Sequence, residues 1–174
     1  TNHPILEQFA KPVFADIQYG TGNINPNDIE KRITKKTKAI IVAHWAGYPA
    51  DLDEINKIAL KYNLKVIEDA SDALGAKYKS KAVGALSNFT CFSFQAIKHF
   101  TTGDGGALIC RSETDYKRSK ALKWFGLDRD ATKDAQGNWQ RKQTVQYMPM
   151  VYGLRKKIVQ SGEIVSLQTG LVYR

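Results

Sequence analysis

The chain has 174 residues, of which 43% are hydrophobic and 25% are charged, a composition typical of a globular domain with a substantial core. No apolar run approaches the roughly 20 residues that span a bilayer, and the first residues lack the pattern of a signal peptide. We therefore expect neither a membrane span nor secretion. The formal net charge of +9 raises nucleic-acid binding as an alternative.

The positive charge is concentrated near the end of the chain. Residues 1–140 carry a net charge of +4, whereas residues 141–174 carry +5. The segment 141–174 lacks the interleaved basic and aromatic side chains of a nucleic-acid stacking platform, and it has no apolar face that would offset its ordering entropy. We expect a folded part, 1–140, and a weakly ordered basic tail, 141–174; a basic nucleic-acid-binding module is the less favoured alternative.

Short apolar runs alternate with helix signals in the folded part. Strands are predicted at 11–16, 38–43, 64–68, 89–94 and 107–110. Because these runs are nearly continuous rather than alternating, we expect strands that are covered on both faces. Helices are predicted at 25–33, 51–62 and 112–126. This alternation predicts an α/β fold with three layers and a mostly parallel sheet.

Three local signals set the predicted helix ends. Asn25 before Pro26 suits the start of the first helix, and Asp51 with Glu54 has the spacing of a capping box at the start of the second. Gly126 is the predicted C-cap of the third.

Several common site motifs are incomplete. The glycines near residues 20 and 103 match neither a dinucleotide fingerprint nor a phosphate loop, and the histidines and cysteines lack metal-ligand spacing, so we expect no metal site. Cys91 and Cys110 lie in strand-like runs, and we interpret them as reduced core residues of a cytoplasmic protein.

Two residues are chemically unusual for their positions. Asp69 ends a predicted buried strand, and ligands of open α/β sheets bind at the carboxyl ends of strands. On residue type alone, a helix cap is the more common role for such an aspartate. Lys98 follows the strand that ends near Phe94, and an isolated lysine is more often a solvated surface residue. Spacing alone leaves both alternatives open.

The stretch CFSFQAIKHFTTGDGG, with VIEDASDALGA and AHWAGYPADLDEI upstream, resembles the DegT/StrS-type family of nucleotide-sugar aminotransferases. The resemblance runs from about residue 9 to residue 139. These enzymes are fold-type I proteins that use pyridoxal 5′-phosphate (PLP), so the resemblance implies a fragment of the fold-type I large domain. Family members are about twice as long, which implies a chain that is truncated at both ends.

The resemblance also implies roles for four residues. Lys98 matches the lysine that forms a Schiff base with PLP, and Asp69 matches the aspartate that faces the pyridine nitrogen. Ser93 matches the serine that binds the phosphate. Asp72 stands where the family usually has Gln or His near the phenolic oxygen, and a second carboxylate there would be repulsive unless it were protonated or turned away. His44 and Gly47 match family positions that we interpret as structural.

The function that the resemblance implies is transfer of an amino group from an amino acid, glutamate, to a nucleotide-linked 4-keto-6-deoxy sugar by a homodimer. A sugar dehydratase of the same family is an alternative, but that branch typically has histidine in place of the lysine. A catalytically incomplete fragment of such an enzyme is the other alternative.

Overall fold

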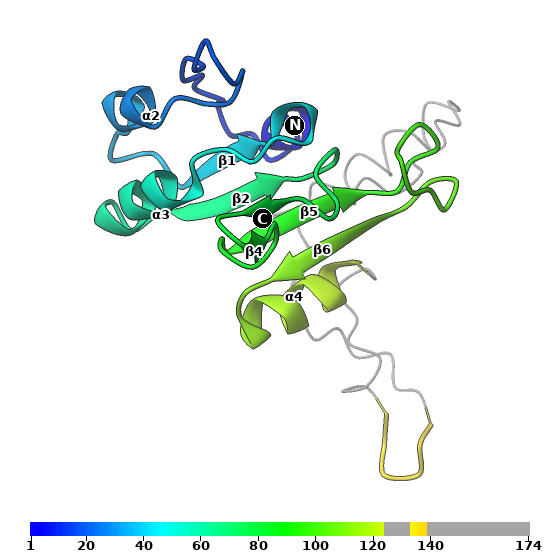
Figure 1. Ribbon diagram of the computed structural model, residues 1–174. Helices are drawn as coiled ribbons and strands as arrows, with labels where there is room; N and C mark the ends of the chain where they lie inside the picture. Colours follow the sequence, from blue (N-terminus) through cyan, green and yellow to red (C-terminus); the bar gives the residue numbers. More distant parts are fainter. Residues whose placement is uncertain (124–132, 139–174) are drawn as a thin grey trace, which may run out of the picture. The chain divides into compact units, whose positions relative to one another are not determined.

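The structure, a computed structural model, describes residues 1–123 and 133–138 (Figure 1). The chain divides into two units, Thr1–Glu113 and Thr114–Arg174, and each is described by itself. The described part of the second unit comprises most of helix α4 (Glu113–Lys123) and residues 133–138. The predicted tail 141–174 and the predicted cap Gly126 lie outside the described residues.

The first unit is built on a four-stranded sheet in the order β1-β2-β5-β6 (Figure 1). Its strands are β1 (Ala39–Ala43), β2 (Lys65–Asp69), β5 (Phe89–Ser93) and β6 (Gly106–Cys110). The first three run parallel, and β6 runs antiparallel to β5. The predicted α/β fold with a mostly parallel sheet is confirmed, and these strands match four of the predicted runs within one residue at each end.

The predicted strand at 11–16 is wrong. The apolar side chains Val13 and Phe14 are 62% and 66% exposed, and the segment pairs with no strand of the described sheet. Its last residue bonds instead to the start of helix α2 (Pro26–Arg32): the Asp16 amide donates to the Asp28 carboxylate at 2.8 Å. Strand-like composition fails here because a strand also needs a neighbouring strand for its backbone groups.

Helices α2 and α3 (Leu52–Lys61) pack together, and α3 also packs on β2. Apolar residues of α3 recur at helical spacing, so one side of the helix is buried. The resulting core contains Ile29, Ile40, Val42, Ala50, Ile55, Ala59 and Val66. On the other face of the sheet, residues such as Ile41 and Ile67 are half-buried, so fully buried positions alternate along β1 and β2.

The two predicted helix starts have different outcomes. Asn25 caps α2 as predicted, because its side chain accepts a hydrogen bond from the Asn27 amide at 3.0 Å. Asp51 is the N-cap residue of α3 but makes no side-chain cap hydrogen bond. Its carboxylate instead accepts from the Gln18 side chain at 2.8 Å, which ties α3 to the segment that precedes α2.

Sequence patterns missed four short elements. These are helix α1 (His3–Glu7), the 3-10 turn η1 (Trp45–Gly47) and the hairpin of β3 (Lys77–Tyr78) and β4 (Lys81–Ala82). The hairpin turn has positive φ at Lys79 and Ser80, without the Asn-Gly or Asp-Gly pair that normally signals such a turn.

Candidate active site

The predicted site residues gather at the carboxyl ends of neighbouring parallel strands. Asp69 is the last residue of β2, and Ser93 is the last residue of β5. The two strands are paired, with Asp69 opposite Cys91. Next to them, the His44 amide that follows β1 donates to the Asp69 carbonyl at 3.1 Å. The edge at which open α/β sheets bind ligands therefore carries a carboxylate and a hydroxyl.

The Asp69 side chain is 24% exposed and lies in a polar setting. Its carboxylate accepts hydrogen bonds from the Thr1 hydroxyl and, at 3.2 Å, from the Ser71 amide. Burial raises the pKa of Asp69, but these hydrogen bonds outweigh burial and hold the pKa of this carboxyl below its ordinary value. Asp69 is thus an ionised carboxylate at neutral pH. Its hydrogen bond with the Ser71 amide lies at the start of the turn that leads to Asp72.

Lys98 and Asp72, 26 residues apart in the chain, form an ion pair. The Lys98 Nζ lies 2.7 Å from the Asp72 Oδ1, and the lysine side chain is only 20% exposed. The turn that carries the lysine is held by a bond from the Lys98 amide to the Gln95 carbonyl at 2.9 Å. The structure therefore places Lys98, the lysine that the family resemblance implies is reactive, next to Asp72, which stands where the family usually has Gln or His.

The segment around Lys98 folds back onto β5. Phe94 and Phe100 stack edge to face with ring centroids 5.3 Å apart, and the Thr102 amide donates to the Phe94 carbonyl at 3.0 Å. Gly103 has a φ of 84°, in the left-handed region that glycine adopts readily, which allows a tight turn here. Ser93 is half-buried, and its hydroxyl oxygen accepts from the Gln95 amide at 3.4 Å.

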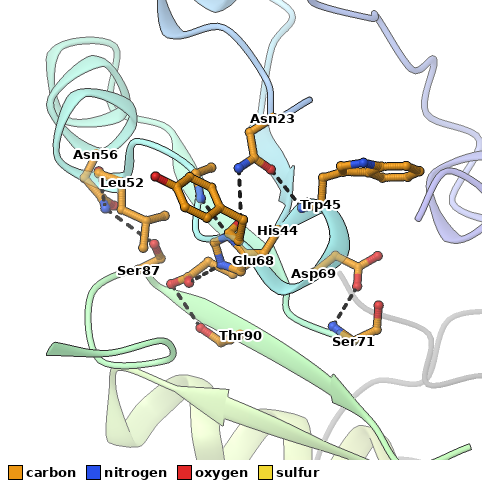
Figure 2. Close-up of polar contacts among 12 residues, drawn as sticks. Asn23, His44, Trp45, Leu52, Asn56, Glu68, Asp69, Ser71, Ser87 and Thr90 are labelled. Atoms are coloured by element: carbon orange, nitrogen blue, oxygen red, sulfur yellow. Dashed lines mark hydrogen bonds and ion pairs between the residues drawn. The ribbon is translucent and has the colours of Figure 1, made fainter. Parts of the chain in front are cut away.

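A buried polar cluster that the sequence did not reveal lies behind this edge, on the α3 face of the sheet (Figure 2). At its centre, the His44 Nε2 lies 2.8 Å from the Glu68 carboxylate, and both side chains are fully buried. Thr90 donates to the other carboxylate oxygen at 3.1 Å, and Ser87 also bonds to Glu68. The cluster ends at Asn56 of α3, whose side chain bonds to Leu52 and Ser87.

The hydrogen bonds of His44 fix its tautomer. The Ala50 amide donates to His44 Nδ1 at 3.1 Å, so Nδ1 carries no proton and Nε2–H donates to Glu68. Burial raises the pKa of Glu68, but the bonds from His44, Ser87 and Thr90 outweigh burial and leave the pKa of this carboxyl below its ordinary value. Glu68 is therefore a buried carboxylate stabilised by donors. The expectation that His44 has a structural place is consistent with its burial.

One sequence signal could have pointed to Glu68. In the run Lys65–Asp69, a strand whose buried positions alternate places Glu68 on the same face as Val66. A carboxylate at a core position needs donors to be tolerated, and these come from residues distant in sequence. No spacing rule identifies such partners before the fold is known.

The residues at this edge fit PLP in chemical type. An ionised carboxylate such as Asp69 stabilises a protonated pyridine nitrogen, a lysine amine reacts with an aldehyde, and a serine hydroxyl donates to phosphate. The Asp72 carboxylate pairs with the Lys98 amine, and its effect near the phenolic oxygen of the cofactor stays a prediction. The four predicted residues are thus brought together in the first unit.

Other kinds of site find less support in the structure. In the part of the chain that is described, no group of histidine, cysteine, aspartate or glutamate residues could hold a metal ion. No helix within the described ranges is long and apolar enough to cross a membrane. An open cavity of about 510 Å³ is lined by residues that include Gln18, Tyr48 and Lys77, and none of the four predicted site residues contributes to it.

The sequence profile of the DegT/DnrJ/EryC1/StrS aminotransferase family matches residues 1–154, most of the chain. The chain belongs to this family. The matched range is wider than the stretch from 9 to 139 on which the resemblance was noted, and it includes the first part of the segment predicted as a tail.

Two relatives are similar to most of this chain. The chain is 49% identical over 141 residues to the uncharacterized protein MJ1066 of Methanocaldococcus jannaschii, a match that covers 80% of this chain and 36% of the relative. It is 42% identical over 118 residues to the GDP-perosamine synthase of Escherichia coli O157:H7, covering 68% of this chain and 32% of that enzyme. The chain thus spans about a third of the length of these relatives.

A solved structure shows the same fold. The aminotransferase from Psychrobacter cryohalolentis superposes with a TM-score of 0.75 and 34% sequence identity, and the match covers 90% of this chain and 42% of that chain. The α/β fold with a mostly parallel sheet is therefore that of a segment of an aminotransferase.

Proposed function

We propose that the chain is part of a PLP-dependent enzyme that transfers an amino group from glutamate to the keto group of a nucleotide-linked keto-deoxy sugar. The observation that carries this proposal is the convergence of Lys98, Asp72, Asp69 and Ser93 in a member of an aminotransferase family. Similarity to a GDP-perosamine synthase supports a nucleotide sugar as the amino acceptor.

Each of the four residues has a distinct task in this proposal. Bound here, PLP would supply the electron sink for loss of a proton from the substrate Cα. The ionised carboxylate of Asp69 would stabilise a protonated pyridine nitrogen. Lys98 would hold the cofactor through Nζ, and its free amine would move the substrate proton as a general base. Ser93 would donate to the phosphate.

Asp72 distinguishes this chain from the usual family pattern. Its carboxylate lies 2.7 Å from the Lys98 Nζ, so it orients the amine before any cofactor is bound. Because Asp72 is 51% exposed, solvent screens this pair, and the interaction contributes at most about 1 kcal/mol to stability. We therefore assign Asp72 a role in placing Lys98 rather than in stabilising the fold.

A second candidate follows from the length of the chain relative to its relatives. Matches cover 36% and 32% of the two named relatives, so most of each relative lies outside the matched segment. The candidate is a fragment that carries part of the cofactor site without turnover. The dehydratase alternative is disfavoured, because Lys98 is a lysine, although His99 is its neighbour.

The transfer reaction tests the proposal directly. The product of the complete reading frame is incubated with PLP, ¹⁵N-labelled glutamate and a nucleotide-linked 4-keto-6-deoxy sugar, and the sugar is analysed by mass spectrometry. We expect label in the sugar for the parent and for Lys81→Ala, an exposed lysine of β4, and none for Lys98→Ala. A labelled sugar from Lys98→Ala, or deoxygenated sugar without label from the parent, would contradict the proposal.

A further inference from the structure

The loop 44–50, which joins β1 to α3, has an unusual backbone. It contains η1, where Ala46 has φ 50° and ψ 29°, and Gly47 has φ 81°. A non-glycine residue in the left-handed region is costly and persists only where the surroundings hold it. The side chains that hold this loop are therefore informative.

Two buried side chains close the loop on itself (Figure 2). His44 Nδ1 accepts from the Ala50 amide at 3.1 Å, so the ring of the first residue binds the backbone of the last. The Asn23 side chain bridges the middle: its Oδ1 accepts from the Trp45 amide at 2.8 Å, and its Nδ2 donates to the Tyr48 carbonyl at 2.9 Å. Both His44 and Asn23 are 2% exposed, so these bonds are shielded from water.

The same imidazole joins the loop to the sheet. Its Nε2–H donates to Glu68, which occupies the position before Asp69 on β2, while the His44 amide donates to the Asp69 carbonyl. Glu68 fixes the ring orientation, because Nε2 must carry the proton for Nδ1 to remain an acceptor. His44 therefore bonds to the loop through Nδ1, to the Glu68 side chain through Nε2 and to the end of β2 through its amide.

The closed loop lies directly against the turn that carries Asp72. A Cβ at Gly47 would lie 2.6 Å from the Asp72 carbonyl oxygen, so the two backbones are in close contact and glycine is required there. The Asp72 carboxylate in turn lies 2.7 Å from the Lys98 Nζ. The Gly47 amide also donates to the His44 carbonyl at 3.1 Å. The loop that the His44 ring closes at Ala50 is therefore linked through Gly47 and Asp72 to the amine.

We propose that His44, oriented by Glu68, is a positioning residue of the cofactor site: by closing the loop 44–50 against the Asp72 turn, it sets the place of the Lys98 amine and of Asp69. This inference rests on the proposed function only in that PLP is the group toward which the amine is placed. It predicts that the acceptor at Nδ1, not simply the filling of the buried space, matters for the site.

Two substitutions separate the two hydrogen bonds of the ring. His44→Asn retains an acceptor near Nδ1 for the Ala50 amide and loses the donor to Glu68, whereas His44→Gln retains a donor near Nε2 and loses the acceptor. Asn56→Ala is the matched control, because Asn56 lies at the far end of the same buried cluster and bonds neither the loop nor Asp69. Thermal unfolding establishes that each variant is folded and how far each is destabilised.

Two measurements are made on the 174-residue chain. The first is hydrogen exchange of the Ala50 amide, which should be roughly tenfold or more faster in His44→Gln, while amides of β5 keep the parent rate. The second is the rate at which added PLP becomes attached to Lys98, trapped with borohydride. We expect a loss of about tenfold to a hundredfold in His44→Gln, because small misplacement of a reacting group has effects of this size. His44→Asn should recover most of the rate, and Asn56→Ala should match the parent.

The outcomes separate the inference from the proposed function. Attachment in the parent with unchanged attachment in His44→Gln overturns the positioning role, as does equal loss in Asn56→Ala at equal destabilisation. If the parent itself attaches no PLP to Lys98, the proposed function fails for this chain. Ala50 exchange then decides whether His44 closes the loop, and an unchanged rate in His44→Gln overturns that too.

Discussion

Adjacent residues of β2, Glu68 and Asp69, carry carboxylates with different surroundings. Glu68 is fully buried on the α3 face and receives bonds from His44, Thr90 and Ser87. Asp69, on the next position, is partly exposed at the edge where Lys98 and Ser93 gather. Because side chains alternate along a strand, one carboxylate serves the packing of the fold and the other faces the ligand edge.

Replacing Asp69 by asparagine should damage catalysis far more than folding. The amide retains the size and accepting oxygen of the carboxylate but loses the charge that keeps the pyridine nitrogen protonated, which is worth roughly 1.5–3 kcal/mol as a charge-assisted bond. An unprotonated pyridine nitrogen also accepts electrons from the substrate less well. We therefore expect transamination by the complete enzyme to fall by several orders of magnitude. Steady-state assays and chemical denaturation measure both effects; Glu54→Gln, on exposed helix surface, is the control. Near-parental turnover would contradict the role.

Glu68 should make the fold sensitive to acid. Its pKa is depressed in the folded state, so its contribution to stability is fully present above the ordinary value of 4.5 and is lost as pH falls through the lower folded value. The free energy of unfolding of Glu68→Gln should therefore depend less on pH below about 4.5 than that of the parent. Urea denaturation between neutral and acid pH measures this; parallel curves for the two proteins would show that Glu68 is not responsible. Some acid slope remains from Asp28, Glu30 and Asp69, whose pKa values are also lowered.

Elements whose apolar residues follow a regular pattern could be predicted from the sequence, whereas elements that depend on contacts with other segments could not. Helix α3 and strands β1, β2 and β5 appear where the pattern places them, because burial against one another is what the pattern encodes. The segment 11–16 has the same composition but no strand neighbour. The hairpin of β3 and β4 depends on positive φ at Lys79 and Ser80, which residue type does not signal.

Gly47 offers a test of the contact between the loop 44–50 and the Asp72 turn. Gly75 has nearly the same φ, 82° against 81°, but a Cβ there would meet nothing within 4 Å. Gly75→Ala should therefore show the backbone cost alone, about 1–2 kcal/mol. Gly47→Ala should lose about 1–3 kcal/mol more, because its Cβ would collide with the Asp72 carbonyl. Chemical denaturation compares the two, and equal losses would show that the loop does not press on the turn.

At the scale of the whole molecule, the family resemblance identified the candidate site residues, and the structure identified the contacts that hold the surrounding segments in place. Asp69 and Lys98 could be singled out because family motifs place them, although spacing alone favoured a cap and a surface lysine. The pairing of Lys98 with Asp72 and the cluster around Glu68 could not be predicted, since both join residues more than 20 positions apart. Such contacts depend on strand order, which the sequence pattern does not specify.

The complete enzyme should be a homodimer. Several large apolar side chains of the first unit are exposed, among them Phe9 at 84%, Ile97 at 83% and Trp45 at 65%, and such residues commonly mark surfaces that another chain or segment covers. Light scattering of the product of the complete reading frame should give twice the mass of one chain. A monomer with full aminotransferase activity would contradict this expectation.

The most direct test of the account is to identify the lysine that binds PLP. The 174-residue chain, in which Lys98 is one of 19 lysine residues, is incubated with PLP and reduced with borohydride. It is then digested, and the modified peptide is identified by mass spectrometry. We predict a single modified peptide, with the label on Lys98, an absorbance band of the bound cofactor before reduction, and loss of both in Lys98→Ala. Label on exposed lysines such as Lys81 instead, or no label on a folded chain, would contradict the assignment of the cofactor site.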